Sequence, residues 1–436
     1  MRKRTSFALG FLALIALGAF LLASPFARVE GSWGDPLTAA FTSCSAVCIT
    51  GLSVVDIAAE YSRAGQLVLM LLVDVGCIGL MTFGTFLLIA VGRRLSLSSE
   101  FSLMNAYGVA QVKGLKGLIF WIVASLLAIE AAFAVILRPW MPGWFESIFY
   151  SIMSFCNAGF GLRTDSLATF DRGLPLLMMG LETILGGIGF LVIYNLCTFW
   201  FLRRTSGANG RLSLHTRVVL RYTVYLLLLG FIAFLAVEWN VTLAGMGLKD
   251  KLVVGLYQAI TPRTCGFTVV PTESLHPFTC LVYEFLMFIG GAPGSAAAGM
   301  KVTTLAVILY TMTAMCRGET ETVIRRRTIP TEIVRESLVI FMALIMFVSF
   351  VTGALFLSEA GRGIPSDRLF FEAVSAVTTT GLTVGDTTAN LSTCGKLVIM
   401  VAMFIGRLGA LTVVMMIGDK ESTRHVRFPT EELVVG

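Results

Sequence analysis

Four glycines recur along the chain at a nearly constant spacing, each at the end of a short apolar segment. They are Gly51, Gly159, Gly266 and Gly381, and they lie 108, 107 and 115 residues apart. Leu or Phe follows each glycine, and an apolar residue lies ten positions before it. A local motif at a fixed period indicates an internal repeat. Because each apolar segment is too short to cross a bilayer, the pattern predicts four re-entrant helices around one ion pathway.

The composition places these segments in a membrane. Hydrophobic residues make up 56% of the chain, charged residues make up 14%, and the mean hydropathy is +0.83. Soluble domains contain roughly 25% charged residues. The nine cysteines form no CxxC pair and the three histidines lie far apart, so we expect no zinc or redox site. The sequence shows no clustered nucleophile, base or metal ligands, and we therefore do not expect an enzyme.

Eight apolar segments are close to the ~20 residues that cross a bilayer as a helix. They lie at about 7–24, 66–91, 115–137, 174–202, 217–239, 279–316, 333–358 and 396–418. One glycine segment falls within each consecutive pair, so each repeat is predicted to run helix, short helix, loop, helix. The predicted repeats are 1–92, 93–204, 205–317 and 318–436, the last with a short cytoplasmic tail. We predict an all-α polytopic membrane protein with eight transmembrane helices, in which four parallel repeats surround a central pathway as in potassium channels.

The basic residues predict the orientation of the chain. In this topology, 20 of the 33 Lys and Arg residues fall on the side of the N-terminus and 11 on the opposite side. The positive-inside rule then predicts a multi-pass protein of the cytoplasmic (inner) membrane with both termini in the cytoplasm. The net charge of +6 follows from this bias, so we expect the lipid bilayer and not nucleic acid as a partner. The basic residues at 2–4 and the apolar run after them resemble a signal peptide, but we expect an uncleaved helix because the first repeat needs one.

The last four residues of each glycine segment suit a partly dehydrated monovalent cation. Neutral backbone carbonyls replace the water around the ion without trapping it, and glycine supplies the necessary dihedral freedom. The negative C-terminal ends of the short helices would add cation selectivity. The predicted filter residues, which act mainly through backbone carbonyls, are Cys48, Ile49, Thr50, Gly51, Cys156, Asn157, Ala158, Gly159, Arg263, Thr264, Cys265, Gly266, Thr378, Thr379, Thr380 and Gly381.

A second glycine motif begins 24 to 27 residues after each filter glycine. Its glycines are Gly76 and Gly79, Gly186 and Gly189, Gly290 and Gly294, and Gly406 and Gly409. Small residues allow helices to pack closely in a membrane. We expect the same glycines to keep the pore-lining helices slim where four of them meet.

The second long segment of the third repeat is predicted to be interrupted. As one helix at 1.5 Å per residue, 279–316 would overshoot a ~30 Å hydrocarbon core. The glycines and the proline within 290–299 oppose helix formation. We predict a loop at membrane depth that acts as a gate; a kinked helix is the alternative. The predicted gate residues are Gly290, Gly291, Gly294, Ser295, Gly299, Lys301 and Arg407.

Two of these gate residues carry a charge inside a predicted span, where charge is costly and usually functional. Arg407 occupies the position that Cys77, Gly187 and Gly291 hold in the other repeats. We expect it to face the axis as an electrostatic barrier, with a structural ion pair as the alternative. Lys301 ends the loop, and a carboxylate could anchor it. The available carboxylates are Asp74, Glu130, Glu182 and Glu284.

These motifs resemble the TrkH/KtrB superfamily of potassium transporters over nearly the whole chain. The resemblance rests on Thr50-Gly-Leu52, Asn157-Ala-Gly-Phe160, Arg263-Thr-Cys-Gly-Phe267, Thr380-Gly-Leu382, the loop at 290–301 and Arg407. The chain begins directly with the first repeat, whereas TrkH-like members carry two extra N-terminal helices. The closer resemblance is therefore to the KtrB branch.

The resemblance implies potassium uptake through a channel-like filter. It implies a homodimer with one pore per subunit, and a cytosolic nucleotide-binding ring of KtrA type as the gating partner. Potassium would be the substrate, sodium would be a second candidate ion on which uptake could depend, and nucleotide would bind only to the partner subunit. In the family the filter glycines confer potassium preference, the loop gates and the arginine constricts the pore. Cys77 departs from a usual glycine, and Ala296 and Ala298 depart from a usual Thr and Gly, which could stiffen the gate.

Other classes of cation transporter stay open at this point. A secondary symporter that couples sodium or protons, or a poorly selective sodium/potassium transporter, could use the same repeats. A four-domain voltage-gated channel would need a further helix with Arg or Lys at every third residue, and the sequence has none.

Overall fold

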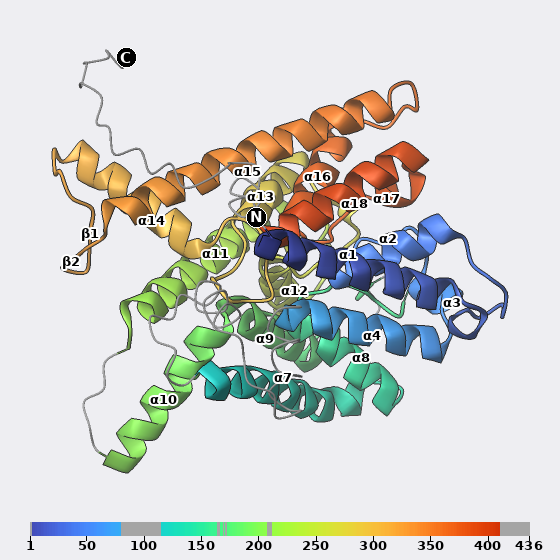
Figure 1. Cartoon of the computed structure of the whole chain (residues 1–436), viewed down its shortest axis with the longest axis horizontal. Helices are drawn as coiled ribbons and strands as arrows, with labels where there is room; N and C mark the ends of the chain where they lie inside the picture. The colour runs from blue at the N-terminus through green and yellow to red at the C-terminus, as the bar shows by residue number, and fades with distance from the viewer. Residues whose placement is uncertain are drawn as a thin grey trace.

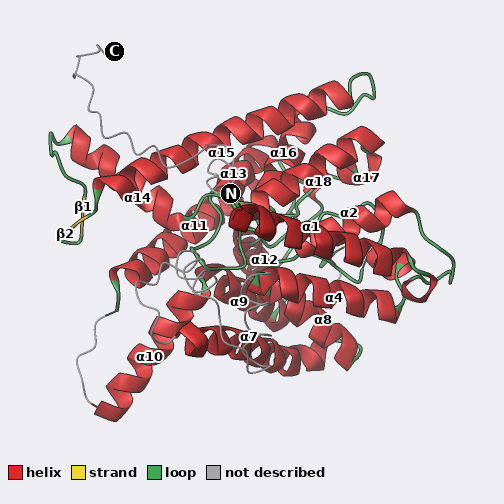
Figure 2. Ribbon diagram, viewed as in Figure 1, coloured by secondary structure: helices red, strands yellow, loops and turns green. Residues whose placement is uncertain are grey.

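The computed structural model describes residues 2–79, 115–206 except 164, 165, 169 and 171, and 212–409. This part of the chain is mostly helical (Figures 1 and 2). Its one β element is a hairpin of β1 (Val323–Ile324) and β2 (Arg327–Thr328). We call the ranges 2–79, 115–206, 212–316 and 331–409 units 1 to 4.

Each unit contains a short helix that leads into one of the four glycine stretches. Unit 1 comprises α1 (Arg2–Ala23), η1 (Pro25–Ala27), α2 (Pro36–Val47), α3 (Ile57–Glu60) and α4 (Arg63–Ile78). Unit 2 comprises α7 (Leu115–Leu137), η2 (Arg138–Trp140), α8 (Trp144–Phe155), α9 (Leu174–Ile188) and α10 (Phe190–Ser206). Unit 3 comprises α11 (Leu214–Glu238), α12 (Leu248–Ile260), η3 (Thr272–Ser274), α13 (Pro277–Phe288) and α14 (Val302–Cys316). Unit 4 comprises α15 (Thr331–Ser358), α16 (Ser366–Val377), α17 (Thr387–Asn390) and α18 (Thr393–Leu408).

The four units follow one another around a common centre. α4 contacts α8, α9 contacts α12, α13 contacts α16, and α18 contacts α2, so unit 4 returns to unit 1. In units 1, 2 and 4 the short helix also contacts the helices before and after it within its own unit. Each of these contacts between neighbouring units involves one short helix, so α2, α8, α12 and α16 lie where the units meet.

Local capping fixes where several of these helices begin. The Asp35 carboxylate accepts hydrogen bonds from the amide (2.9 Å) and the hydroxyl (2.8 Å) of Thr38, while Pro36 occupies the first turn of α2. These bonds, the hydroxyl foremost, hold the pKa of Asp35 below its ordinary value. Ser62 and Ser392 cap α4 and α18 in the same manner. Side chains of this kind satisfy amides that the first turn leaves without a partner.

Three described helices are individually long and apolar enough to cross a membrane. They are Gly117–Trp140, Leu214–Glu238 and Thr331–Ser358. Ala8–Ala23, Pro277–Phe288 and Val302–Cys316 are shorter apolar helices. The second halves of the predicted spans 66–91 and 396–418 lie outside the described residues. The total of eight transmembrane helices therefore stays a prediction.

The second long segment of unit 2 is not the single helix that we predicted over 174–202. α9 ends at Ile188, and α10 leaves it at an angle of 99°. Gly189, between them, has φ 88°, a conformation that glycine adopts easily because it has no Cβ. The amide of Phe190 donates to the carbonyl of Gly294 (3.0 Å), which ties the bend to unit 3.

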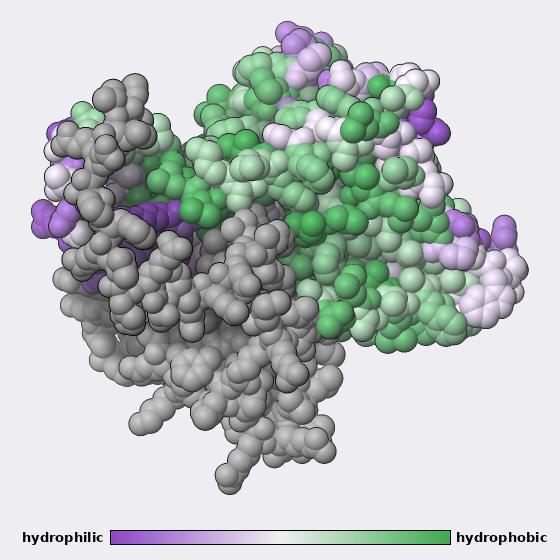
Figure 3. All heavy atoms as spheres, turned by 45° about the horizontal axis from the view of Figure 1, so that its top comes forward, coloured by the Kyte–Doolittle hydropathy of each residue, from purple (hydrophilic) through white to green (hydrophobic). Residues whose placement is uncertain are grey.

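The outer surface agrees with a lipid environment. Figure 3 shows hydrophobic residues over much of the described part of one face, with hydrophilic residues gathered near its margins. On α15, Leu357, Phe350 and Met346 are 84%, 73% and 71% exposed. Contiguous apolar surface of this kind is unusual on soluble monomers but matches the hydrocarbon of a bilayer.

Candidate functional site

The four glycine stretches share one backbone conformation. The second residue of each stretch has a positive φ, at 55° for Ile49, 56° for Asn157, 67° for Thr264 and 50° for Thr379. The final glycines also have positive φ, at 89° for Gly51, 66° for Gly159, 82° for Gly266 and 83° for Gly381. Positive φ is uncommon for residues with a side chain, and a β-branched residue there is an outlier. Its recurrence in all four units indicates a shared local conformation that the surrounding structure enforces.

Backbone amides of these stretches donate hydrogen bonds to carbonyls of the short helices or of the residue that follows them. The third residue of the stretch donates to the short helix in units 1, 2 and 4, with Thr50 bonding Ser45 (2.8 Å), Ala158 bonding Met153 (2.9 Å) and Thr380 bonding Ser375 (2.8 Å). In unit 3 the corresponding amide, of Cys265, donates to the Thr261 carbonyl (3.0 Å). With the N–H groups turned toward the helices, the carbonyls of the same residues remain for other partners.

The carbonyls of these third residues and the four glycines contact one another in a closed circle, and we call the four glycine stretches together the ring. A Cβ atom placed on Gly51 would strike the carbonyl oxygen of Ala158, and one on Gly381 would strike that of Thr50. The other two contacts complete the circle: a Cβ on Gly159 would lie 2.8 Å from the Cys265 oxygen, and a Cβ on Gly266 would lie 2.8 Å from the Thr380 oxygen. Each glycine thus touches the third residue of a neighbouring unit. The four predicted filter stretches lie together at one place, and only glycine fits at the contacts.

A polar vestibule lies on one side of this ring. Its volume is about 550 Å³, and all four ring glycines line it. The carboxylates of Asp56, Glu273 and Asp386 line the same cavity, together with the guanidinium of Arg163. An excess of negative groups at the mouth of a narrow passage raises the local concentration of cations.

The second glycine motif supports the ring. A Cβ on Gly76, Gly186 or Gly406 would collide with the carbonyl of the last residue of a short helix, namely Val47, Phe155 or Val377. The following glycines, Gly79, Gly189 and Gly409, have φ values of 80°, 88° and 85° and lie where their helices end. The motif therefore permits close packing against the short helices and also terminates a helix, a second role that the sequence analysis missed.

The described residues contain a loop at 289–301 between α13 and α14, where the sequence predicted an interruption. The loop doubles back on itself, because Met300 donates to the Phe288 carbonyl (3.0 Å) and Val302 to that of Gly291 (3.1 Å). It also binds unit 2: the amides of Ala292 and Ala296 donate to the carbonyls of Gly187 (3.0 Å) and Gly186 (3.3 Å). A kinked helix, the alternative, does not describe this segment.

Arg407 joins three units. Its guanidinium donates to the Gly76 carbonyl (2.7 Å) in unit 1 and to the Ala296 carbonyl in the loop of unit 3. The side chain starts from the end of α18 in unit 4. A guanidinium stays charged at any physiological pH. It therefore places a fixed positive charge against the loop and the end of α4.

Lys301 does not bind a carboxylate, contrary to the anchor that we considered. Its ammonium donates to the Ala297 carbonyl (2.5 Å), and within the described ranges no carboxylate comes within ion-pair distance of it. Three of the candidate partners lie elsewhere. Asp74 and Glu130 each lie 3.6 Å from the sulfur of Cys156, and Glu182 accepts from the Ser151 hydroxyl (2.5 Å).

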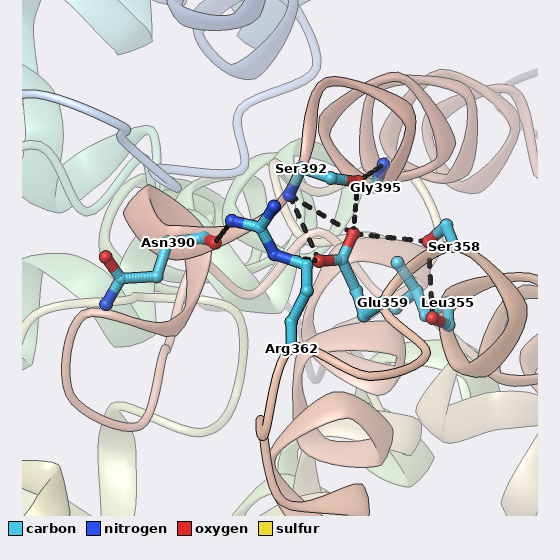
Figure 4. A network of polar contacts seen from close by, with 7 residues as sticks. All are labelled: Leu355, Ser358, Glu359, Arg362, Asn390, Ser392 and Gly395. Atoms are coloured by element: carbon cyan, nitrogen blue, oxygen red, sulfur yellow. Dashed lines mark hydrogen bonds and ion pairs between the residues drawn. The ribbon is translucent and has the colours of Figure 1, made fainter.

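Two buried glutamates, which the sequence analysis did not single out, connect helices within units 3 and 4. Glu238 ends α11 and accepts from the His276 amide (2.9 Å) and the Thr279 hydroxyl (2.6 Å). Glu359 follows α15 and accepts from the Ser392 hydroxyl (2.5 Å) at the start of α18 (Figure 4). Both residues terminate the first long helix of a unit and bind the start of a later one. A glutamate at the end of the first long helix in both units is the sequence signal that could have identified them.

A third glutamate supports the ring directly. Glu372 lies on α16, is fully buried, and accepts from the hydroxyls of Thr383 (3.0 Å) and Thr388. Both threonines belong to the segment that follows Gly381. The equivalent residue of unit 2, nine positions before its glycine, is Tyr150, whose hydroxyl accepts from the Leu162 amide (3.1 Å). The short helices α16 and α8 thus hold the segment that follows their glycine as well as the stretch that precedes it.

The β hairpin presents basic residues far from the ring. Arg325 and Arg326 form its two-residue turn, with φ 50° and 64°, and Arg327 begins β2. All three are exposed. Figure 1 shows the hairpin at the opposite end of the molecule from α3 and α17. Residues 80–114, 207–211 and 410–436 lie outside the described residues.

Comparisons with known proteins agree over nearly the whole chain. Residues 12–424 match the family described as TrkH, cation transport protein. The Ktr system potassium uptake protein B of Bacillus subtilis is 35% identical over 98% of this chain and 96% of its own length. The potassium/sodium uptake protein NtpJ of Enterococcus hirae is 32% identical over 100% of this chain and 98% of its own. In fold, the chain is similar to the crystal structure of the potassium transporter TrkH from Vibrio parahaemolyticus, with a TM-score of 0.75 at 18% identity over 95% of this chain and 85% of the other.

Proposed function

The chain belongs to the TrkH family of cation transport proteins, as its motifs predicted, and we propose that it takes up potassium through a channel-like pathway. This is a family of transporters, so the expectation that the chain is not an enzyme is confirmed. The names of the relatives from B. subtilis and E. hirae support potassium as substrate. The ring of four glycine stretches is the single observation that carries the proposal.

The ring is proposed as the selectivity filter. Its carbonyls replace the water of a permeating ion, and the short helices direct their negative ends toward the same place. The positive φ values at alternate residues turn successive peptide groups, which leaves the carbonyls available while the amides bond to the helices. The vestibule with its three carboxylates is the proposed entrance for cations.

The loop at 289–301 and Arg407 form the proposed gate. The loop follows the ring in the path of the ion, and Arg407 binds it across the pathway to unit 1. A positive charge at this point opposes a cation until the loop or the side chain moves. Opening then requires that the hydrogen bonds of Ala292, Ala296 and Arg407 be exchanged for others.

We further propose four parallel repeats and eight membrane-spanning helices around this pathway. The cyclic contacts among the units support one central axis. The basic hairpin and the acidic vestibule lie toward opposite ends, which supports a cytoplasmic hairpin and an outward-facing vestibule. With this orientation both termini are cytoplasmic.

A homodimer and a cytosolic nucleotide-binding ring are the proposed partners. The name of the B. subtilis relative, a protein of a Ktr system, supports further components. The basic hairpin is the proposed docking element, because it presents exposed charge on a short, defined turn. Nucleotide would act through that partner.

A second candidate, a transporter that also carries or couples sodium, is favoured by the potassium/sodium name of the E. hirae relative. Uptake of potassium, rubidium and sodium in a host that lacks its own potassium transport separates the two. Saturable potassium and rubidium uptake that excess sodium does not inhibit supports the proposal. Comparable sodium uptake, or flux that stops without a sodium gradient, contradicts it.

A further inference from the structure

Arg263 is unlike the residues that open the other three glycine stretches. The corresponding residues are Cys48, Cys156 and Thr378, all small, whereas unit 3 has an arginine. Its side chain is buried, with 8% of the residue exposed. Its Nη2 atom donates to the carbonyl of Gly290 at 3.2 Å. Gly290 is the second residue of the loop at 289–301, so one hydrogen bond links the ring directly to the loop.

The environment of Arg263 makes this hydrogen bond important. A buried guanidinium stays charged, and burying it is costly unless its hydrogen bonds are satisfied. Within the described ranges no carboxylate comes within ion-pair distance of Arg263, and its Nε atom has no hydrogen-bond partner. The Gly290 carbonyl is therefore the main acceptor that fixes the direction of this side chain.

Among the described residues, three cationic side chains hydrogen-bond the loop, and they come from different parts of the chain. Lys301 belongs to the end of the loop itself and bonds Ala297 (2.5 Å). Arg407 comes from unit 4 and bonds Ala296. Arg263 alone comes from a glycine stretch of the ring. A displacement of that stretch is passed to the first residues of the loop only through Arg263 among these three.

The space around Arg263 allows such a displacement. A cavity of about 10 Å³ lies against Arg263 and is also lined by Gly187, Gly291 and Thr183. That is about the space of a single water molecule. The other lining residues include Ile184, Leu227 and Ile260, so the cavity gives the guanidinium room for a small shift only.

We propose that Arg263 is a positioning residue that couples the ring to the loop, so that the cation occupancy of the ring biases whether the loop stays closed. This inference rests on the proposed function, in which the ring is the filter and the loop the gate. The coupling is reciprocal: a loop that opens releases Arg263 and relaxes the third stretch. Among the described residues, Arg263 is the one side chain of the four stretches that hydrogen-bonds the loop, so unit 3 carries the connection.

The test compares hydrogen exchange of the loop amides, in the full-length protein in lipid nanodiscs, with potassium and with choline as the only cation. In the wild type we expect potassium to slow exchange in segment 289–301. Arg263→Met removes the donor at similar length and should abolish this potassium-dependent difference. Arg263→Lys keeps a charged donor and should preserve part of it. The matched control is Arg63→Met, which removes an exposed guanidinium bonded to Glu146 (2.7 Å) outside the ring and should leave the difference intact.

The remaining outcomes decide the proposal. If Arg263→Met speeds exchange equally in both cations but keeps the potassium-dependent difference, the residue only supports the structure and the coupling is wrong. If the wild type shows no potassium-dependent difference, the coupling is also wrong. Potassium flux of the wild-type protein in liposomes is measured in parallel. Absent flux would count against the proposed function itself, whereas normal flux with uncoupled exchange would overturn only the role of Arg263.

Discussion

The guanidinium of Arg407 donates to the carbonyl of Gly76 at 2.7 Å, although 331 positions of sequence separate the two residues. Gly76 is also the residue whose missing side chain lets α4 approach the end of α2. The Gly76 carbonyl thus belongs to the packing that supports the first glycine stretch and also binds the charge that we propose as the barrier. Removing the arginine should affect transport and stability together.

Replacing Arg407 with Gln or Ala should raise the maximal rate of potassium uptake. Both variants remove the fixed charge from the path of the cation and release the Ala296 carbonyl of the loop. The ratio of potassium to sodium uptake should change little, because the ring is not altered. A rise of about tenfold would correspond to a barrier lower by 1.4 kcal/mol.

The arginine also holds units together, so protein abundance and melting temperature must be measured with the flux. Charged hydrogen bonds contribute about 1.5–3 kcal/mol each to stability, and Arg407→Ala should lower the melting temperature. Normal abundance combined with slower transport would favour a purely structural role and overturn the barrier.

Serine at the ring glycines should reduce the preference for potassium over sodium. Besides the strain of positive φ, about 1–2 kcal/mol, the new Cβ collides with a carbonyl of the neighbouring unit. The collisions are closest at Gly51 and Gly381, so these variants should lose more selectivity than Gly159→Ser and Gly266→Ser. The relative uptake of potassium, rubidium and sodium measures this order.

Gly245→Ser is the matched control for backbone strain. Gly245 has φ 80°, but a Cβ there would meet nothing within 4 Å. We expect this variant to keep wild-type selectivity. Unaltered selectivity at both Gly51 and Gly381 would show that the ring is not the filter.

Shortening the loop within Ala292–Ala298 should raise potassium flux and weaken its control by a cytosolic partner. The deletion removes the hydrogen bonds from Ala292 and Ala296 to unit 2 and one of the two carbonyl acceptors of Arg407. Flux through proteoliposomes, with and without the partner, is the measurement. A stable variant with normal flux and normal regulation would mean that the loop is no gate.

The sequence predicted the short helices and the glycine stretches well because both follow from a repeated local pattern. α7 spans Leu115–Leu137, the range predicted from hydropathy alone, and the loop in unit 3 occurs where the apolar segment was too long for one helix. The bend at Gly189 was missed. Hydropathy stays high through 174–202, and nothing local separates a glycine that packs from one that ends a helix.

The contacts of the candidate site were less predictable. The positive φ at Ile49, Asn157, Thr264 and Thr379 has no common residue type to signal it. The acceptor of Lys301 is a backbone carbonyl four residues away, whereas charge complementarity pointed to distant carboxylates. Backbone acceptors are present at every position, so the sequence cannot indicate which one a buried cation will use.

Glu359→Ala should destabilise the protein without altering selectivity. The Glu359 carboxylate is 3% exposed in the folded chain, and its loss leaves the Ser392 amide and hydroxyl without their acceptor. An unsatisfied buried group costs about 1–3 kcal/mol, and because Ser392 is half-buried we expect the lower end of this range and a fall in the melting temperature. Arg362→Ala is the control: this side chain is 50% exposed, and such an ion pair contributes about 0–1 kcal/mol. Equal effects of the two substitutions would mean that the ion pair, and not the cap of α18, is the stabilising contact.

Removing the charge of the hairpin should weaken binding of a cytosolic ring partner. Arg325 and Arg326 lie at the two central positions of a tight turn with positive φ. Asn-Gly is the preferred pair for such a turn, so Arg325→Asn with Arg326→Gly removes two charges and keeps the hairpin. We expect this double variant to retain less ring partner in a pull-down, and Arg327→Glu to lower retention further.

The salt dependence of partner binding distinguishes recognition of the hairpin's charge from recognition of its shape. Binding through exposed arginines falls as salt screens them, since the Debye length shortens from about 10 Å at 0.1 M to 3 Å at 1 M. The wild type should lose partner over this range, and the Asn-Gly variant should respond less. Arg362→Glu, on the opposite side of the membrane in the proposed orientation, controls for the general effect of charge reversal. The triple variant combines Arg325→Asn, Arg326→Gly and Arg327→Glu. If it retains the partner at wild-type strength, the hairpin is not the docking element.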